Sequence, residues 1–125
     1  MTLGEMEMRV RYIVEDHHEP YRFVAGFVLT ALCEGVERLR EIRPESRYFG
    51  VSLFDWERPT GMTPKDMEDE DVAAARATEL YTDPKWNAAL CAFAASRCYE
   101  HDQSDTANAA LAADHMAKFE RLAVT

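Results

Sequence analysis

The sequence has few cysteines and no long apolar run. Its three cysteines, Cys33, Cys91 and Cys98, cannot form a framework of paired disulfides, because their number is odd and the last two share one predicted helix. No window approaches the ~20 apolar residues that a membrane-spanning helix needs. The first residues carry neither the basic nor the apolar segment of a signal peptide. These absences predict buried, reduced thiols in a soluble protein that is not exported.

Basic residues are also scarce. The chain has 14 Lys and Arg against 23 Asp and Glu, which gives a formal net charge of −9 and a pI near 4.8. Neutralising the phosphates of a nucleic acid needs clustered Lys and Arg, so this balance disfavours direct binding of DNA or RNA. Solubility is the simplest consequence of such a charge. The length of 125 residues predicts a single domain, residues 1–125.

Motifs that carry catalysis are lacking too. No serine lies in a Gly-x-Ser-x-Gly turn, and the sequence has no Gly-rich phosphate loop. Asp16-His17-His18-Glu19 is a cluster of metal-ligand residue types, but adjacent imidazoles on a connector rarely converge on one ion. The acidic run 66–71 does not have the Asp-x-Asp-x-Asp-Gly pattern of a calcium loop. We therefore predict no enzymatic activity, no cofactor and no metal site.

Helical periodicity dominates what the chain does contain. Apolar residues recur every three or four positions over 3–14 and 24–42, and a further helix is expected near Val72. Pro20 is expected in the first turn of the second helix and Pro44 at its end, because proline has no amide hydrogen to donate. The fold is therefore predicted to be mainly α, a small bundle of four or five helices.

The first predicted helix has an apolar side and a charged side. Glu7 and Arg11 are among the charged residues expected to face solvent. The apolar side is expected to be buried, and its members are Leu3, Met6, Val10, Ile13 and Val14.

The segment at about 46–63 breaks the helical pattern. Six large apolar side chains fall within residues 48–56, and Val51-Ser52-Leu53 alternates as in a strand. The segment is expected to be an extended loop or one short strand inserted between two helices. It either folds back over the helical core or docks as an arm on a neighbouring subunit. The candidate partner-interface residues are Tyr48, Phe49, Leu53, Phe54 and Trp56.

The last third of the chain, 86–122, has the pattern of two Ala-rich helices joined by a short polar turn. Ser104 or Asp105 is expected to cap the second helix by accepting its first backbone amide hydrogens. One buried face of this helix is predicted from apolar residues at 3–4 residue spacing: Ala109, Ala112, Met116, Phe119 and Ala123.

Two stretches of the chain carry an ordered set of residues. The C-terminal one has an Arg-small-Tyr-x-x-Asp run, then an Asn, an Ala-rich stretch, a His and a Phe: Arg97, Tyr99, Asp102, Asn108, Ala112-Ala113, His115 and Phe119. The N-terminal one runs from Leu29 through Leu32 and Gly35 to Arg43-Pro44. In order and spacing, the chain resembles the head–tail connector (adaptor) proteins of short-tailed bacteriophages. The similarity covers roughly residues 3–45 and 84–122.

The resemblance implies a structural virion protein without enzymatic turnover. Such a chain would form a homo-oligomeric ring, dodecameric in this family, between the portal protein and the tail or nozzle proteins. Packaged DNA would be retained and would pass through the channel without sequence-specific binding, and acidic walls would keep it from sticking. The protein would assemble in the host cytoplasm, reside in the virion and have no membrane partner. The C-terminal motif residues would serve packing.

Two other interpretations belong to different classes. The first is a small acidic phage protein that regulates or inhibits a host partner, with carboxylates that mimic DNA. It predicts monomers or dimers where a connector predicts rings. The second is a metal-dependent enzyme built on His17 and His18, which predicts bound metal in the purified chain.

Overall fold

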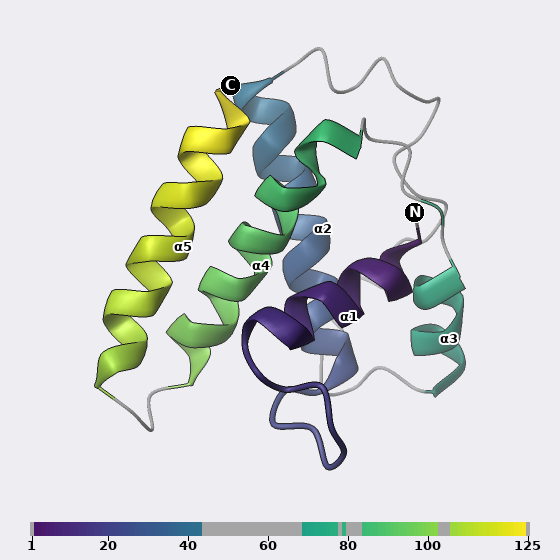
Figure 1. Cartoon of the computed structure of the whole chain (residues 1–125). Coiled ribbons are helices and arrows are strands. Elements are labelled where there is room, and N and C mark those ends of the chain that lie inside the picture. The colour runs from purple at the N-terminus through teal and green to yellow at the C-terminus, as the bar shows by residue number, and fades with distance from the viewer. Residues whose placement is uncertain (1, 44–68, 78, 80–83, 103–105, 125) are drawn as a thin grey trace.

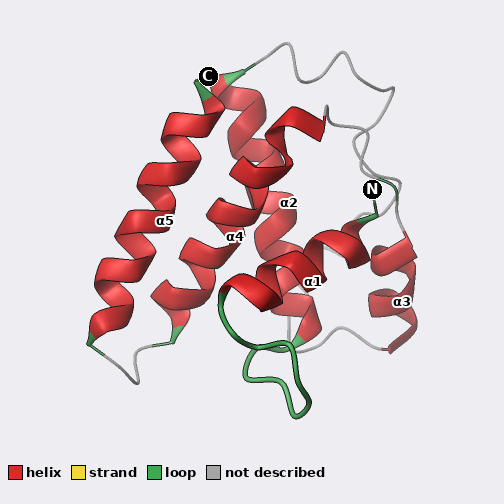
Figure 2. Ribbon diagram, viewed as in Figure 1, coloured by secondary structure: helices red, strands yellow, loops and turns green. Residues whose placement is uncertain are grey.

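The computed structural model describes residues 2–43, 69–77, 79, 84–102 and 106–124, and every structural statement below concerns these residues. They form a small helical bundle, so the prediction of a mainly α fold with four or five helices is confirmed. Figures 1 and 2 show the helices: α1 (Leu3–Ile13), α2 (Ala25–Ile42), α3 (Asp69–Ala77), α4 (Asn87–His101) and α5 (Ala107–Ala123), with a short 3-10 turn, η3 (Pro84–Trp86), before α4.

Pairing of the β type occurs at one point among the described residues. Thr2 and Glu79 form an isolated antiparallel bridge, and no strand occurs among the described residues. The aromatic segment at about 46–63 lies outside the described residues, so the expected loop or strand there stays a prediction. None of the described helices combines the length and the apolar character needed to cross a bilayer.

Helix α4 is the central element of the bundle. It packs against α1, α2 and α5, and α5 runs antiparallel beside it to form a hairpin (Figure 1). Nearly every side of α4 is buried, because alanines over 88–95 let neighbouring helices approach closely. Helix α3 packs on α1 and α2, on the side of the bundle away from α5 (Figure 1).

A glycine and two phenylalanines set the distances between α2, α4 and α5. A Cβ atom added at Gly35 of α2 would lie 3.1 Å from the Phe93 ring of α4, so the bare backbone lets the two helices approach. The Phe93 ring meets Phe119 of α5 edge to face, with 5.1 Å between centroids. Helices α2, α4 and α5 therefore meet at the Phe93 ring, which contacts Gly35 on one side and Phe119 on the other.

Capping interactions define both ends of α1. Thr2 and Glu5 form a capping box at its start, where Thr2 Oγ1 accepts from the Glu5 amide at 3.1 Å. At its end the Glu15 amide donates to the Tyr12 carbonyl and the Asp16 amide to the Arg11 carbonyl, the pattern of a Schellman motif. Glu15 has φ = 58°, a left-handed conformation that usually selects glycine.

The predicted position of Pro20 was wrong. Helix α2 begins at Ala25, so Pro20 lies in the connector and not in a first helical turn. The reason is a side chain: the Asp16 carboxylate accepts from the backbone amides of Arg22 at 2.6 Å and Phe23 at 3.0 Å. Those amides are thereby bonded in a non-helical loop before α2 starts.

Some predicted faces were also placed inaccurately. Ile13 is exposed, Val24 is exposed at the start of α2, and Ala109 of α5 is exposed. Because α5 packs chiefly on α4, only a narrow stripe of it is covered, which includes Ala112 and Phe119. The residue that precedes α5 is Thr106, which makes no side-chain capping bond, and the predicted caps at 104 and 105 lie outside the described residues.

Candidate interaction site on the helical hairpin

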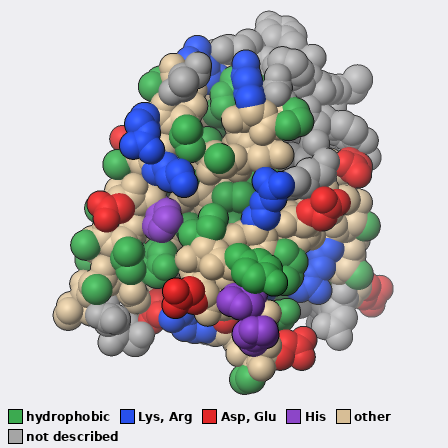
Figure 3. All heavy atoms as spheres, viewed as in Figure 1, with side chains coloured by type: hydrophobic (Ala, Val, Ile, Leu, Met, Phe, Trp, Pro, Cys, Tyr) green, Lys and Arg blue, Asp and Glu red, His purple; other side chains and the backbone are tan. Residues whose placement is uncertain are grey.

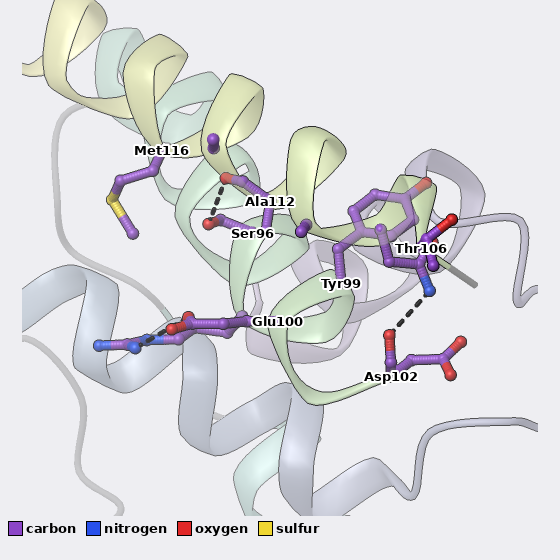
Figure 4. A pocket seen from close by; sticks show the side chains of 11 residues that line it. Ser96, Tyr99, Glu100, Asp102, Thr106, Ala112 and Met116 are labelled. Atoms are coloured by element: carbon purple, nitrogen blue, oxygen red, sulfur yellow. Dashed lines mark hydrogen bonds and ion pairs between the residues drawn. The ribbon is translucent and has the colours of Figure 1, made fainter. Parts of the chain in front are cut away.

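A pocket of about 520 Å³ lies between α4 and α5, close to the turn that joins them (Figure 4). Six of the residues that line it are positions of the C-terminal motif: Arg97, Tyr99, Asp102, Asn108, Ala112 and Ala113. The structure therefore brings together at one site residues that the sequence only placed in order.

Two hydrogen bonds between side chain and backbone tie the helices together around this pocket. Ser96 Oγ donates to the Ala112 carbonyl at 2.7 Å, and Asn108 Nδ2 donates to the Asp102 carbonyl at 2.8 Å (Figure 4). The second bond satisfies a carbonyl at the end of α4, where no further turn of helix supplies an amide. Asn108 thus sets how closely α5 returns along α4.

The remaining motif residues lie along the same hairpin. The Tyr99 ring stacks on His115 with 5.6 Å between centroids and an angle of 11° between planes. Burial lowers the pKa of His115, with the Lys118 charge acting in the same direction, and burial raises the pKa of Tyr99. Phe119 is fully buried against Phe93. These contacts fit the packing role that the resemblance implies.

Arg97 connects the hairpin to α2. Its guanidinium lies 3.1 Å from the Glu100 carboxylate and 3.5 Å from the Glu34 carboxylate of α2, and it covers the Phe93 ring at 5.1 Å. The pocket therefore borders α2 through Arg97, whereas Tyr99, which also lines it, donates to the Ile13 carbonyl of α1 at 3.5 Å.

The N-terminal motif also reaches the hairpin at its other end. Arg43 Nε donates to the Ala123 carbonyl at 2.8 Å, at the end of α5. A cation at a helix C-terminus is favourable because unpaired carbonyls give that end a partial negative charge. The two stretches that carry the resemblance thus meet at three places: Arg43 on Ala123, Gly35 on Phe93 and Glu34 on Arg97.

Several of the pocket's polar groups already have partners within the chain. The hydroxyl of Ser96 is engaged by a backbone carbonyl, and Arg97 is engaged by two carboxylates. None of the described lining residues is a histidine or cysteine placed as a base or nucleophile. Burial raises the pKa of the Cys91 thiol to about 11 and that of Cys98 to about 12, so both are poor nucleophiles at neutral pH.

A buried group of charges forms a second polar site, and sequence reasoning missed it. Arg11 is fully buried and donates to Glu7 at 2.9 Å, to Asp16 at 2.8 Å and to the Phe23 carbonyl at 3.0 Å. Arg76 of α3 reaches the same Glu7 carboxylate at 2.7 Å. We call Glu7, Arg11, Asp16 and Arg76 the charged corner.

The expectation that Glu7 and Arg11 face solvent was therefore wrong. The Asp16 carboxylate and the Phe23 carbonyl lie within reach of the Arg11 guanidinium, and this gives a buried cation its partners. The available signal was the i, i+4 spacing of Glu7 and Arg11, which also occurs in exposed pairs. Nothing in the sequence marks Asp16 as their third partner.

The histidines beside Asp16 lie in an aromatic stack. The His17 ring lies 4.3 Å from Tyr12 at an angle of 14°, and His18 is tilted against His17. No group of three residues able to hold a metal ion occurs among the described residues. The candidate partner residues Tyr48, Phe49, Leu53, Phe54 and Trp56 lie outside the described residues, and their role as core or arm stays a prediction.

No protein-family model, curated protein or solved structure matches the chain. A functional proposal for it rests on its residues and their geometry.

Proposed function

We propose that the chain is a head–tail connector of a tailed bacteriophage, a subunit of a ring between the portal and the tail. The observation that carries the proposal is the convergence of the two stretches that resemble this family. The contacting residues are more than 50 positions apart in the sequence: Arg97 pairs with Glu34, and Phe93 covers Gly35. Both stretches therefore contribute to the same helical core.

The physical character of the hairpin supports a role in assembly. Its pocket is open, lined by small side chains of α5 and rimmed by charged residues that already hold one another. Such a site recognises shape and charge on another surface and has no group placed to make or break a bond. In this role the net charge of −9 keeps passing DNA from adhering to the ring.

The test is to mix the purified chain with the portal protein encoded in the same genome. Light scattering after gel filtration gives the mass of each species, and negative-stain images give its shape. We expect rings with a central channel, bound to one end of the portal, and portal alone is the control.

Two other results would reject the connector. Monomers or dimers that ignore the portal at every concentration would reject the connector, and they would favour an acidic regulator that binds a host protein. Bound metal at one equivalent per chain in elemental analysis would instead favour the enzyme built on His17 and His18.

A further inference from the structure

The outward side of α1 exposes more apolar surface than a solvent-facing helix needs. Met8, Tyr12 and Ile13 are all exposed, and the side chain of Tyr12 is 63% accessible. With Glu5 and Arg9 they occupy one side of the helix, because they recur at intervals of one, three and four residues. A contiguous apolar patch on a small protein commonly marks a contact with another molecule.

Two cations accompany this patch. Arg9 of α1 and Lys118 of α5 are both exposed, and neither forms an ion pair with another residue that the structure describes. Figure 3 shows blue and green side chains together on this side of the molecule. We call Met8, Arg9, Tyr12, Ile13 and Lys118 the α1 face.

The side of the molecule formed by α2 has the opposite charge. The exposed residues of α2 recur at 34, 37, 38 and 41, and three of these four are glutamates. Glu34 shares Arg97 with Glu100, and Arg38 is paired with Glu41 at 2.6 Å. This surface thus has four carboxylates and only two guanidinium groups, those of Arg38 and Arg97, that pair with them. We call Glu34, Glu37, Glu41 and Glu100, with the hairpin pocket beside them, the α2 face.

The two faces lie on different sides of the bundle. Helix α1 crosses in front of α4 in Figure 1, whereas α2 lies behind it. The pocket borders both helices: its lining residue Arg97 reaches Glu34 of α2, and its lining residue Tyr99 donates to the Ile13 carbonyl of α1 at 3.5 Å. The α1 face carries exposed apolar residues with cations, and the α2 face carries an excess of carboxylates beside the pocket.

We propose that the α1 face of one copy docks on the α2 face of the next, with Tyr12 entering the hairpin pocket and Arg9 and Lys118 facing the glutamates of α2. The occupant is a second copy, because the charges that one face lacks are those that the other face carries in excess. A contact between two different faces is heterologous, so its repetition closes a ring or extends a filament. The inference rests on the proposed function and names the surfaces that build its ring.

Charge reversal tests the polar half of this contact. Arg9→Glu with Lys118→Glu places like charges across the contact, and so does Glu37→Lys with Glu41→Lys on the other face. We expect each double variant to need at least roughly 10-fold more protein for assembly than the unchanged chain, measured by light scattering with and without portal. Arg38→Glu, which leaves the α2 face acidic, is the control and should assemble normally.

Mixing the two double variants gives the decisive result. In an equimolar mixture every contact regains opposite charges, because an acidic α1 face can meet a basic α2 face. We expect assembly to recover in the mixture although each variant alone stays dissociated. Circular dichroism melting of each variant confirms that the monomer remains folded, as expected for exposed side chains.

The apolar half is tested with two residues of equal exposure. Tyr12 is 63% exposed on the α1 face, and Val124 is 62% exposed after the end of α5. Tyr12→Ser should weaken assembly at least roughly 10-fold, as loss of a central aromatic anchor does, whereas Val124→Ser should leave assembly unchanged. On the other face, Ala113→Trp fills the pocket and should also block assembly, and Ala110→Trp, outside the lining, is its control.

The outcomes separate this inference from the proposed function. Rings that form equally well from all these variants would overturn the docking of these faces and leave the connector standing. An unchanged chain that forms no ring, with or without portal, would overturn the connector and the docking together. Loss of assembly in each double variant without recovery in the mixture would overturn the pairing of these two faces.

Discussion

The hairpin and the charged corner hold the same bundle together by opposite means. In the hairpin, alanines let α4 and α5 approach closely, and the contact is mostly apolar. In the corner, α1, α3 and the connector meet around Arg11, a buried cation with carboxylates on either side. The loss of one apolar contact leaves a small gap, whereas a buried ion that loses its partner leaves a charge in a medium that solvates it poorly. The corner is therefore the more vulnerable region, although it contains far fewer residues.

The largest expected effect is that of Arg11→Met. The substitution keeps most of the side-chain volume but removes the hydrogen bonds to Glu7, to Asp16 and to the Phe23 carbonyl. The free energy of unfolding should fall by about 3–5 kcal/mol, measured by urea denaturation, because Asp16 is left buried without its cation.

Arg38→Met is the matched control for this change. Arg38 is exposed and holds Glu41 at 2.6 Å on the surface of α2. Its loss should cost about 0–1 kcal/mol. Equal effects of the two substitutions would remove the distinction between the corner and an ordinary surface pair.

The second prediction concerns how tightly side chains are packed between α4 and α5. Ala92 of α4 is fully enclosed, so Ala92→Leu should lower the free energy of unfolding by about 1–3 kcal/mol through overpacking. Ala112 of α5 lines the pocket, so Ala112→Leu has space to occupy and should cost clearly less. Thermal melts of both variants check the order. A larger loss for Ala112 would mean that the pocket does not receive the added side chain.

The two regions also differ in how far the sequence predicts them. The two helices of the hairpin were predicted from apolar spacing over 86–122, although Ala109 of the predicted buried face is exposed and Met116 is only half-buried. The convergence of Arg97, Asp102 and Asn108 at one pocket was not predicted, since spacing gives order along the chain and not the register of two helices. The position of Asn108 against the Asp102 carbonyl sets that register.

The charged corner escaped prediction for a physical reason. Periodicity assigns charged residues to solvent, and Arg11 was assigned there with Glu7. Its burial depends on Asp16, which lies beyond the end of the helix, and on Arg76, which comes from a distant helix. Interactions of this kind depend on tertiary structure, so a local pattern cannot contain them.

The third prediction concerns the end of α1, which leads into the corner. Glu15 has φ = 58°, a conformation that costs an L-residue about 1–2 kcal/mol, whereas glycine adopts it freely. Glu15→Gly should therefore raise the free energy of unfolding by up to about 1 kcal/mol once the entropy of glycine in the unfolded chain is subtracted. Asp114→Gly, the same kind of change on the exposed side of α5, should lower it by about 0.3 kcal/mol, the difference between the helix propensities of Asp and Gly. Losses of similar size in both would show that the left-handed turn stores no strain.

The smallest expected effect is a pH dependence in the hairpin. Burial, and after it the charge of Lys118, lowers the pKa of His115 below its ordinary value of 6.5, whereas Asp114 opposes this change. The unfolded chain then binds a proton at higher pH than the folded chain. His115 therefore contributes stability that is present above about pH 6.5 and is lost as the pH falls through the lower folded pKa.

His115→Phe isolates this contribution, because phenylalanine keeps a ring against Tyr99 and does not titrate. Between about pH 7.5 and about pH 5.5, the unchanged chain should lose more free energy of unfolding than the variant, and a proton NMR titration should place the pKa of His115 below 6.5. The effect should be small, since the ring is only half-buried and water still solvates part of its charged form. The variant becoming the more acid-sensitive of the two would reverse the sign of this argument. It would then mean that His115 has a partner that favours its charged form, as Arg11 has in the charged corner. Such a partner raises the pKa of a histidine, whereas burial lowers it.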